Sequence, residues 1–429
     1  MKHGALLLCL GLASAGACGP EPPEGSDSDA GSSSTSEAMT SGGAPTTTVP
    51  GPTPTTNPDP TADPTTGEPV TCPEGQPWEL LGAAELAVPA GFVASARRRV
   101  LAVTEAGQVA IAGALGEAAA PAVLLASPAG EVQAVNAGAP GPEAEVLGLQ
   151  RGPEGDLVLL GARVQNDKRV PFFARFAADG APLSEVPLEL PVLGQVFALT
   201  PDGGIVAGLD QATDQRVLAN FAVDTGALLW NHTLGGADEL VEDAILVGSQ
   251  GPMVLVTRRD VDDQGVSNRL DVDVRDQDGA VLSSTVLEDL PYSFTSAIAL
   301  TPDKQIVVLR TLDPEFVDLI ALDLADGLPV WFQTVAEADP TGRPTARDLI
   351  VDADALTIPV LRTGADEVSL GSVAIQRVAF DGELLETVPL PVPANPAPHS
   401  SVLATRGECG ELVLLAGEEH PLWLGSFAP

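Results

Sequence analysis

The sequence is poor in basic residues, with 21 Lys and Arg against 59 Asp and Glu and a formal net charge of −38. A chain this acidic repels polyanions, so we exclude nucleic acid as a partner. Histidine is also scarce, and beyond His3 the chain has only His232, His399 and His420. Their spacing is not that of a shared metal site, so we expect no metal.

Signatures of catalysis are missing as well. The sequence contains no Gly-x-Ser-x-Gly elbow and no phosphate-binding loop, and it offers no candidate for covalent catalysis. The acidic run at 260–265 is similar to a calcium loop, but Gln264 stands at its fifth position and Asp271 replaces the bidentate Glu at the twelfth. We therefore assign no catalytic residue and favour a non-enzymatic role.

The N-terminus has the pattern of an exported protein. A short basic start precedes an apolar stretch from Gly4 to Ala17, which is too short to span a bilayer and predicts a signal peptide at 1–17. Residues 18–71 are mostly Ser, Thr, Pro, Gly, Ala and acids, which predicts a disordered tether with a span of about 40 Å.

The residues before Cys18 resemble the lipobox of bacterial lipoproteins. Ala15-Gly16-Ala17-Cys18 has its small residues and its cysteine, although Ala15 replaces the usual Leu and also fits ordinary signal cleavage. The resemblance implies that Cys18 is fatty-acylated and anchors the chain in the outer membrane. The tether is similar in style to those of myxobacterial lipoproteins.

An internal repeat follows, with a period near fifty residues. Two apolar runs joined by a turn recur seven times, centred on Gly107, Gly155, Gly203, Gly251, Lys304, Asp354 and Gly410. A second hairpin follows the first six, with its turn at Gly130, Gly180, Gly226, Gly279, Gly327 and Gly382. Two hairpins make a four-stranded blade, so the pattern predicts an all-β fold, a seven-bladed β-propeller. An open solenoid or a pair of sandwiches fits the even spacing less well.

The seventh blade lacks its outer strand, because the chain ends at Pro429. We expect the segment around Trp78 to supply this strand and close the ring. The predicted domain is 72–429, with 72–95 as the closing strand of blade 7, 96–400 as blades 1–6 and 401–429 as the rest of blade 7. We also expect Cys72 and Cys409 to form a disulfide, since both should reach the same side of this blade in an oxidising compartment.

Two of the hairpins resemble the quinoprotein-type propeller repeat, in which a tryptophan follows a Thr-Gly pair. Thr225-Gly226 with Trp230 matches fully, whereas Asp326 replaces the threonine before Gly327 and Trp331. The quinone-dependent members of that family carry adjacent redox cysteines, which this chain lacks, so we expect no cofactor.

Arginines recur after the second strand of four blades, at Arg163, Arg258, Arg310 and Arg362. Each opens a loop with an acid: Asp167, Asp260, Asp313 and Asp366. They are our candidate ligand-binding residues, and the alternative is that they form structural ion pairs.

These features predict a monomeric binding or scaffold lipoprotein that presents a propeller to an unidentified protein or glycan. One alternative is a hydrolase or lyase with paired carboxylates at the channel mouth. Another is an envelope assembly subunit similar to the propeller lipoprotein of the barrel-assembly machinery, although that family has eight blades.

Overall fold

The computed structural model describes residues 72, 75–95, 99–117, 119–139, 143–165, 168–236, 240–248, 252–259, 269–288, 294–312, 315–340, 342–363, 370–392, 402–407, 409–417 and 422–429. The predicted signal peptide, Cys18 and the tether lie outside these residues, as do His399 and His420. Within the described residues there are strands and turns but no helix, and so no helix there that could cross a bilayer.

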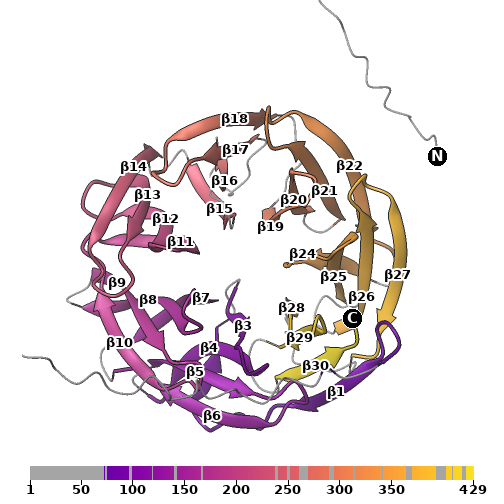
Figure 1. Cartoon of the computed structure of the whole chain (residues 1–429), viewed down its shortest axis with the longest axis horizontal. Helices are drawn as coiled ribbons and strands as arrows, with labels where there is room; N and C mark the ends of the chain where they lie inside the picture. The colour runs from indigo at the N-terminus through magenta and orange to yellow at the C-terminus, as the bar shows by residue number, and fades with distance from the viewer. Residues whose placement is uncertain are drawn as a thin grey trace, which may run out of the picture. The chain divides into compact units, whose positions relative to one another are not determined.

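Seven antiparallel sheets are arranged radially around a central axis (Figure 1). Blade 1 contains β2 (Phe92–Ala94), β3 (Leu101–Val103), β4 (Val109–Leu115), β5 (Ala120–Ala126) and β6 (Val132–Ala137). Blade 2 contains β7 (Ala144–Arg151), β8 (Leu157–Gln165), β9 (Lys168–Phe176) and β10 (Pro182–Pro187). Blade 3 contains β11 (Val192–Thr200), β12 (Gly203–Asp210), β13 (Gln215–Phe221) and β14 (Leu228–Gly236).

Blade 4 contains β15 (Leu240–Val247), β16 (Met253–Arg259), β17 (Arg269–Arg275) and β18 (Val281–Leu287). Blade 5 contains β19 (Phe294–Leu300), β20 (Gln305–Leu312), β21 (Phe316–Asp323) and β22 (Pro329–Glu337). Blade 6 contains β23 (Arg343–Ala346), β24 (Ile350–Val351), β25 (Ala355–Thr363), β26 (Leu370–Ala379) and β27 (Leu384–Leu390). Blade 7 combines β28 (Val402–Arg406), β29 (Leu412–Ala416) and β30 (Trp423–Phe427) with β1 (Leu80–Glu85). The predicted seven-bladed propeller is confirmed.

The hydrophobic core lies between neighbouring blades. Middle strands such as β5 are buried on both faces, as expected for runs rich in Val, Leu and Ala, whereas outer strands such as β14 alternate between half-buried and exposed residues. Phe173 of blade 2, for example, packs against Phe197 and Phe221 of blade 3, with ring centroids 5.6 and 6.5 Å apart. Each blade therefore buries apolar surface against its neighbours.

The second-hairpin glycines form a repeated contact between blades. All six have positive φ, as the turn geometry requires. Each packs on the outer strand of the preceding blade: a Cβ at Gly279 would lie 2.7 Å from the Trp230 ring, and one at Gly382 would lie 2.9 Å from Trp331. The two tryptophans of the quinoprotein-like repeats thus dock on the next blade, which gives them a structural role.

Two details of the repeat differ from the sequence prediction. Gly203 is the first residue of β12 rather than part of the turn, which falls at 201–202. Blade 1 begins at Phe92 rather than at residue 96, because β2 pairs with β4. The inner strand of this blade is interrupted, and its first half lies within the segment assigned by sequence to the closing strand.

The N-terminal strand closes the ring, as predicted. β1 pairs antiparallel with β30, from Leu80 opposite Phe427 to Glu85 opposite Trp423. Backbone hydrogen bonds extend this ladder beyond the strand, since the N–H of Leu86 donates to the carbonyl of Leu422 at 2.8 Å. Blade 7 is therefore built from both ends of the domain.

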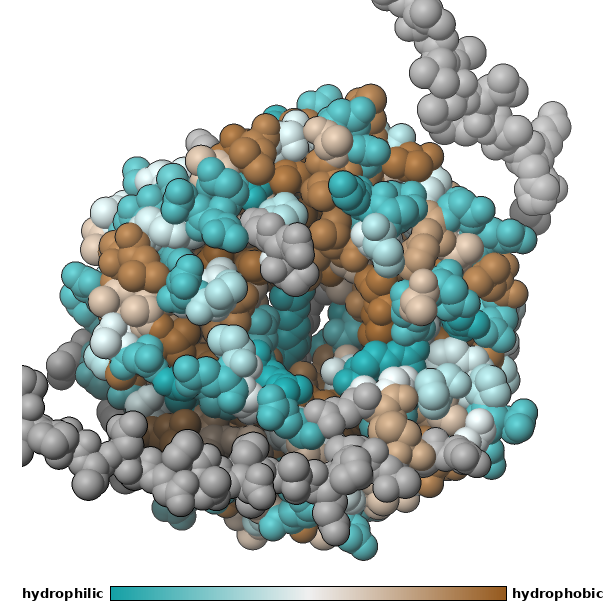
Figure 2. Space-filling view, viewed as in Figure 1, coloured by the Kyte–Doolittle hydropathy of each residue, from teal (hydrophilic) through white to brown (hydrophobic). Residues whose placement is uncertain are grey.

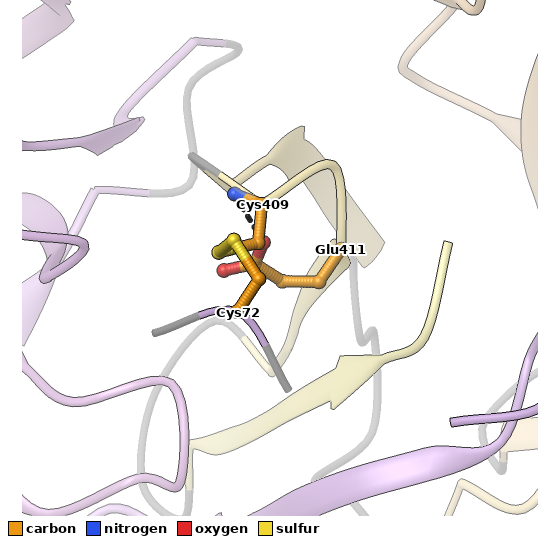
Figure 3. The surroundings of a disulfide bond; sticks show 3 residues. All are labelled: Cys72, Cys409 and Glu411. Atoms are coloured by element: carbon orange, nitrogen blue, oxygen red, sulfur yellow. Dashed lines mark hydrogen bonds between the residues drawn. A yellow bond between two sulfur atoms is a disulfide. The ribbon is translucent and has the colours of Figure 1, made fainter. Parts of the chain in front are cut away.

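A disulfide joins Cys72 to Cys409 beside this closure (Figure 3). The two Cα atoms are 5.3 Å apart, within the range for a direct bond. Cys409 lies in the turn between β28 and β29, where its N–H donates to the Glu411 carboxylate at 3.0 Å. The predicted pairing is present, and it fixes the segment that leads into β1 to the opposite edge of the blade.

Candidate functional site

The four predicted arginines are all engaged by the protein itself. Arg163 donates to both carboxylate oxygens of Glu185 at 2.8 Å and to the carbonyl of Ala139 at 2.7 Å, and its guanidinium lies over the Phe172 ring. Arg362 donates at 2.9 Å to Asp339 and to the carbonyl of Glu337. The Arg163 pair joins two strands of blade 2, and the Arg362 pair joins β25 of blade 6 to the connection between blades 5 and 6.

Arg310 and Arg258 are buried. Arg310 is 1% exposed and contacts the Asp318 carboxylate at 3.2 Å, and Arg258 is 8% exposed and also has a partner. The acids expected beside them, Asp167, Asp260, Asp313 and Asp366, lie outside the described residues. These contacts favour the ion-pair alternative, and a ligand-binding role for the four arginines stays a prediction.

The four arginines also occupy different positions relative to the inner strand. Blades 2 to 5 each have a register shift in that strand. Arg310 is paired with Thr295, the residue of the inner strand next to the register shift. Arg258 lies one residue further away from the register shift of its own blade, and Arg163 lies two residues further away. Since side chains alternate between the faces of a strand, the recurrence in sequence does not place the arginines in a ring.

A cavity of about 420 Å³ lies at the channel instead, and side chains from four blades line it. β3 contributes Leu101 to Val103, the end of β7 contributes Leu149 to Arg151, and β28 contributes Leu403 to Arg406. Asp348, between β23 and β24, and Arg99, between β2 and β3, complete the lining. Figure 2 shows an opening at the centre of the ring with both hydrophilic and hydrophobic residues at its edge.

Interrupted inner strands place Arg99 and Asp348 at this cavity. Where blades 2 to 5 have a bulge, blades 1 and 6 have a longer break that divides the strand in two. Arg99 has a φ of 56°, uncommon for a residue with a side chain, and its carbonyl accepts a 2.7 Å hydrogen bond from Leu149. Its Nη1 donates at 2.5 Å to the carbonyl of Ile245 on β15, so the side chain reaches from blade 1 to blade 4.

The other charged residues of the lining are also held in place. Arg406 binds Asp352 through Nε and Nη2 at 2.6 to 2.9 Å and donates to the carbonyl of Gly410 at 2.7 Å. Arg151 pairs with Glu105 at the surface. Asp348 accepts a 2.7 Å hydrogen bond from the N–H of Ala404, which joins blade 6 to blade 7.

Among the described residues of the lining are three arginines, one aspartate and the half-buried apolar residues Leu101 and Val103. Such a surface can hold a molecule that has both charged and apolar parts. Among the described residues there is no group of three His, Cys, Asp or Glu side chains arranged to bind a metal ion. The arrangement is suited to binding.

Sequence reasoning missed these residues, although two signals point to them. Residues 97–99 are three consecutive arginines in a chain with 21 basic residues. Arg151 and Arg406 each begin the pattern Arg-Gly-x-x-Gly, which ends the inner strand of blades 2 and 7 and enters the first-hairpin turn. Arg151 and Arg406 could have been found by comparing the inner strands of the blades instead of the loops after the second strands.

No protein-family model and no curated protein matches this chain. Solved structures do: a protein of unknown function from Dyadobacter fermentans is 8% identical with a TM-score of 0.50, and the match covers 81% of this chain and 98% of that one. Hydrazine synthase from Kuenenia stuttgartiensis is 14% identical with a TM-score of 0.46, covering 64% and 73%. The Dos1 propeller is 12% identical with a TM-score of 0.44, covering 76% of each chain. At these identities the likeness shows the propeller fold alone.

Proposed function

We propose that the chain is a membrane-tethered, non-catalytic binding lipoprotein whose propeller receives a group of an unidentified protein or glycan in the axial cavity. The observation that carries this proposal is the cavity itself. Its volume of about 420 Å³ lies in the range of small-ligand sites, and four blades contribute to its lining. A site shared by several blades is held rigidly only when the ring is closed, which gives the closure a functional purpose.

The hydrolase alternative requires two carboxylates at the channel mouth, one as acid and one as base or nucleophile. Among the described residues that line the cavity, Asp348 is the one with a carboxylate. The assembly-subunit alternative is weakened by the ring of seven blades, since the family that suggested it has eight. We therefore develop the binding function.

The lipid anchor can be tested with labelled palmitate. We expect the full chain to incorporate the label and to sediment with membranes when it is expressed in a Gram-negative host. Cys18→Ser should abolish the label and release the protein, because acyl chains supply the hydrophobic anchor. Cys9→Ser, in the predicted signal peptide, is the matched control and should change neither result. A Cys18→Ser protein that remains in the membrane fraction would show that the anchor is elsewhere.

Filling the cavity tests the binding site. The full chain serves as bait for envelope extract, and bound proteins and glycans are quantified. Ala404→Phe enlarges a half-buried residue of the cavity lining on β28, so we expect the specific ligand to be retained at least about tenfold less. Ala280→Phe, at an exposed turn of blade 4, is the control and should retain the ligand. If Ala404→Phe retains the same ligand as the unmodified chain, the cavity is not the binding site.

A further inference from the structure

We propose that the group held in the axial cavity is an organic anion: a carboxylate, sulfate or phosphate carried by an apolar body. This inference rests on the proposed function, because it names the chemistry that the binding cavity selects. The whole chain has 59 acidic and 21 basic residues, whereas the charged residues of the lining, within the part of the chain that the structure describes, are Arg99, Arg151, Arg406 and Asp348.

The arginines come from separate parts of the ring. Arg151 ends β7 and Arg406 ends β28, so they occupy the same place in the inner strands of blades 2 and 7. Arg99 comes from the break in the inner strand of blade 1, between these two blades in the ring. Three successive blades thus each contribute an arginine to the lining of one cavity, and guanidinium donors match the geometry of an oxyanion.

Existing contacts fix these side chains before a ligand arrives. Asp352 and the carbonyl of Gly410 hold Arg406, and the carbonyl of Ile245 holds Arg99. Fixed arginines lose less conformational freedom on binding, which favours affinity. The carboxylate partners Glu105 and Asp352 are not part of the lining. The Arg151–Glu105 pair is exposed and contributes little by itself, so an anion in the cavity can share that arginine.

The apolar part of the ligand follows from the walls between the arginines. Leu101 and Val103 of β3 are half-buried, whereas Leu149 and Leu403 are already covered by the core. A small inorganic anion would leave the accessible parts of Leu101 and Val103 facing water, whereas an apolar body would cover them. The site therefore favours an anion attached to a hydrocarbon or aromatic group over free phosphate or sulfate.

A pair of fluorescent probes tests the charge requirement. Anilinonaphthalene sulfonate carries an oxyanion on an aromatic body, and N-phenylnaphthylamine is the same body without the sulfonate. We expect the full chain to bind the sulfonate more tightly. Arg99→Gln combined with Arg151→Gln should raise the dissociation constant of the sulfonate about tenfold or more, since each substitution removes a charged donor. The neutral probe should bind this variant as it binds the unmodified chain, which also reports that the cavity is intact.

Two further variants make the test specific. Arg343→Gln removes an exposed arginine from the start of β23 and should leave both dissociation constants unchanged. Arg99→Lys with Arg151→Lys keeps the charge but not the guanidinium geometry, so it should lose less affinity for the sulfonate than the Gln pair. Equal affinity of the unmodified chain for both probes, or equal losses in the Lys and Gln variants, would overturn the anion inference.

The same probes separate this inference from the proposed function. Ala404→Phe should weaken the binding of both probes if the cavity is the site. Loss of both probes in Ala404→Phe without preference for the sulfonate would leave a binding cavity that does not select anions. Unchanged binding of both probes in Ala404→Phe would contradict the cavity as a site and the anion inference with it. A sulfate ester and a phosphate ester of one aromatic alcohol, compared next, distinguish the head groups.

Discussion

Cys409→Ser is expected to lower the free energy of unfolding by about 4 to 5 kcal/mol, an upper figure from the entropy of the closed loop. The bond joins residues 337 positions apart, so it restricts almost the whole unfolded domain. It also spans the closure, where β1 is an outer strand that would otherwise be held by its ladder with β30 and local contacts. Denaturant titration of the oxidised full chain and the variant measures the difference.

Cys72→Ser is the matched control for this experiment. If the bond is the cause, the two single variants and the double variant should lose the same free energy, and reductant should reduce the stability of the unmodified chain to the same level. A loss confined to Cys409→Ser would instead indicate a packing role for Cys409 in its turn. A change below about 1 kcal/mol in every variant would contradict the stabilising role of the bond.

Arg310→Leu is expected to destabilise the fold by about 3 to 5 kcal/mol, because it leaves the carboxylate of Asp318 buried without its cation. The two side chains are 1% and 5% exposed. Among the described residues, Nε and Nη1 of Arg310 and Oδ1 of Asp318 have no hydrogen-bond partner. A pair buried with so few hydrogen bonds compensates poorly for its desolvation. Arg310→Leu combined with Asp318→Leu should therefore restore the stability to near that of the unmodified chain or above it.

Arg362→Leu is the control, since Arg362 pairs with an exposed Asp339 and should cost no more than about 1 kcal/mol. Thermal denaturation of the four proteins measures the differences. If Arg310→Leu melts no lower than Arg362→Leu, the buried pair has no special energetic role. If it keeps its melting temperature and loses its ligand, the binding role predicted for Arg310 from sequence is supported.

The pH dependence has a defined sign. Burial raises the pKa of the Asp318 carboxyl above its ordinary value, although hydrogen bonds from Thr334 and Arg310 oppose the shift. A raised pKa in the folded state means that the contribution of this group is fully present below the unfolded pKa of about 3.9 and declines as the pH rises through the folded pKa. The double Leu variant should lack this decline.

The architecture could be predicted because its signals are local. Glycines such as Gly130 and Gly382 sit in turns that need positive φ, and they recur at a regular interval. The disulfide followed from the same repeat, since the position of Cys409 in its turn and the missing outer strand together placed Cys72. Boundaries were less certain, and the start of blade 1 was misplaced because the break after β2 hides the inner strand.

The cavity could not be predicted in the same way. It depends on where inner strands bulge or break, and a shift of one residue turns a side chain to the opposite face. The recurring arginines after the second strands suggested a ring, yet Arg258 and Arg310 differ by one position relative to the bulge. Arg99 reaches the cavity through a break in its strand, and its partner on blade 4 is 146 residues away.

The Cys72–Cys409 bond also decides how the domain would carry mechanical load. A pull on the chain before Cys72 would act first on the covalent bond and then on the turn between β28 and β29. Without the bond, the same pull would act on β1 and separate it from β30 one hydrogen bond at a time. With it, the force bypasses this ladder and enters the strands on the channel side of blade 7. A load applied to the chain before Cys72 would therefore leave the ring closed at β1.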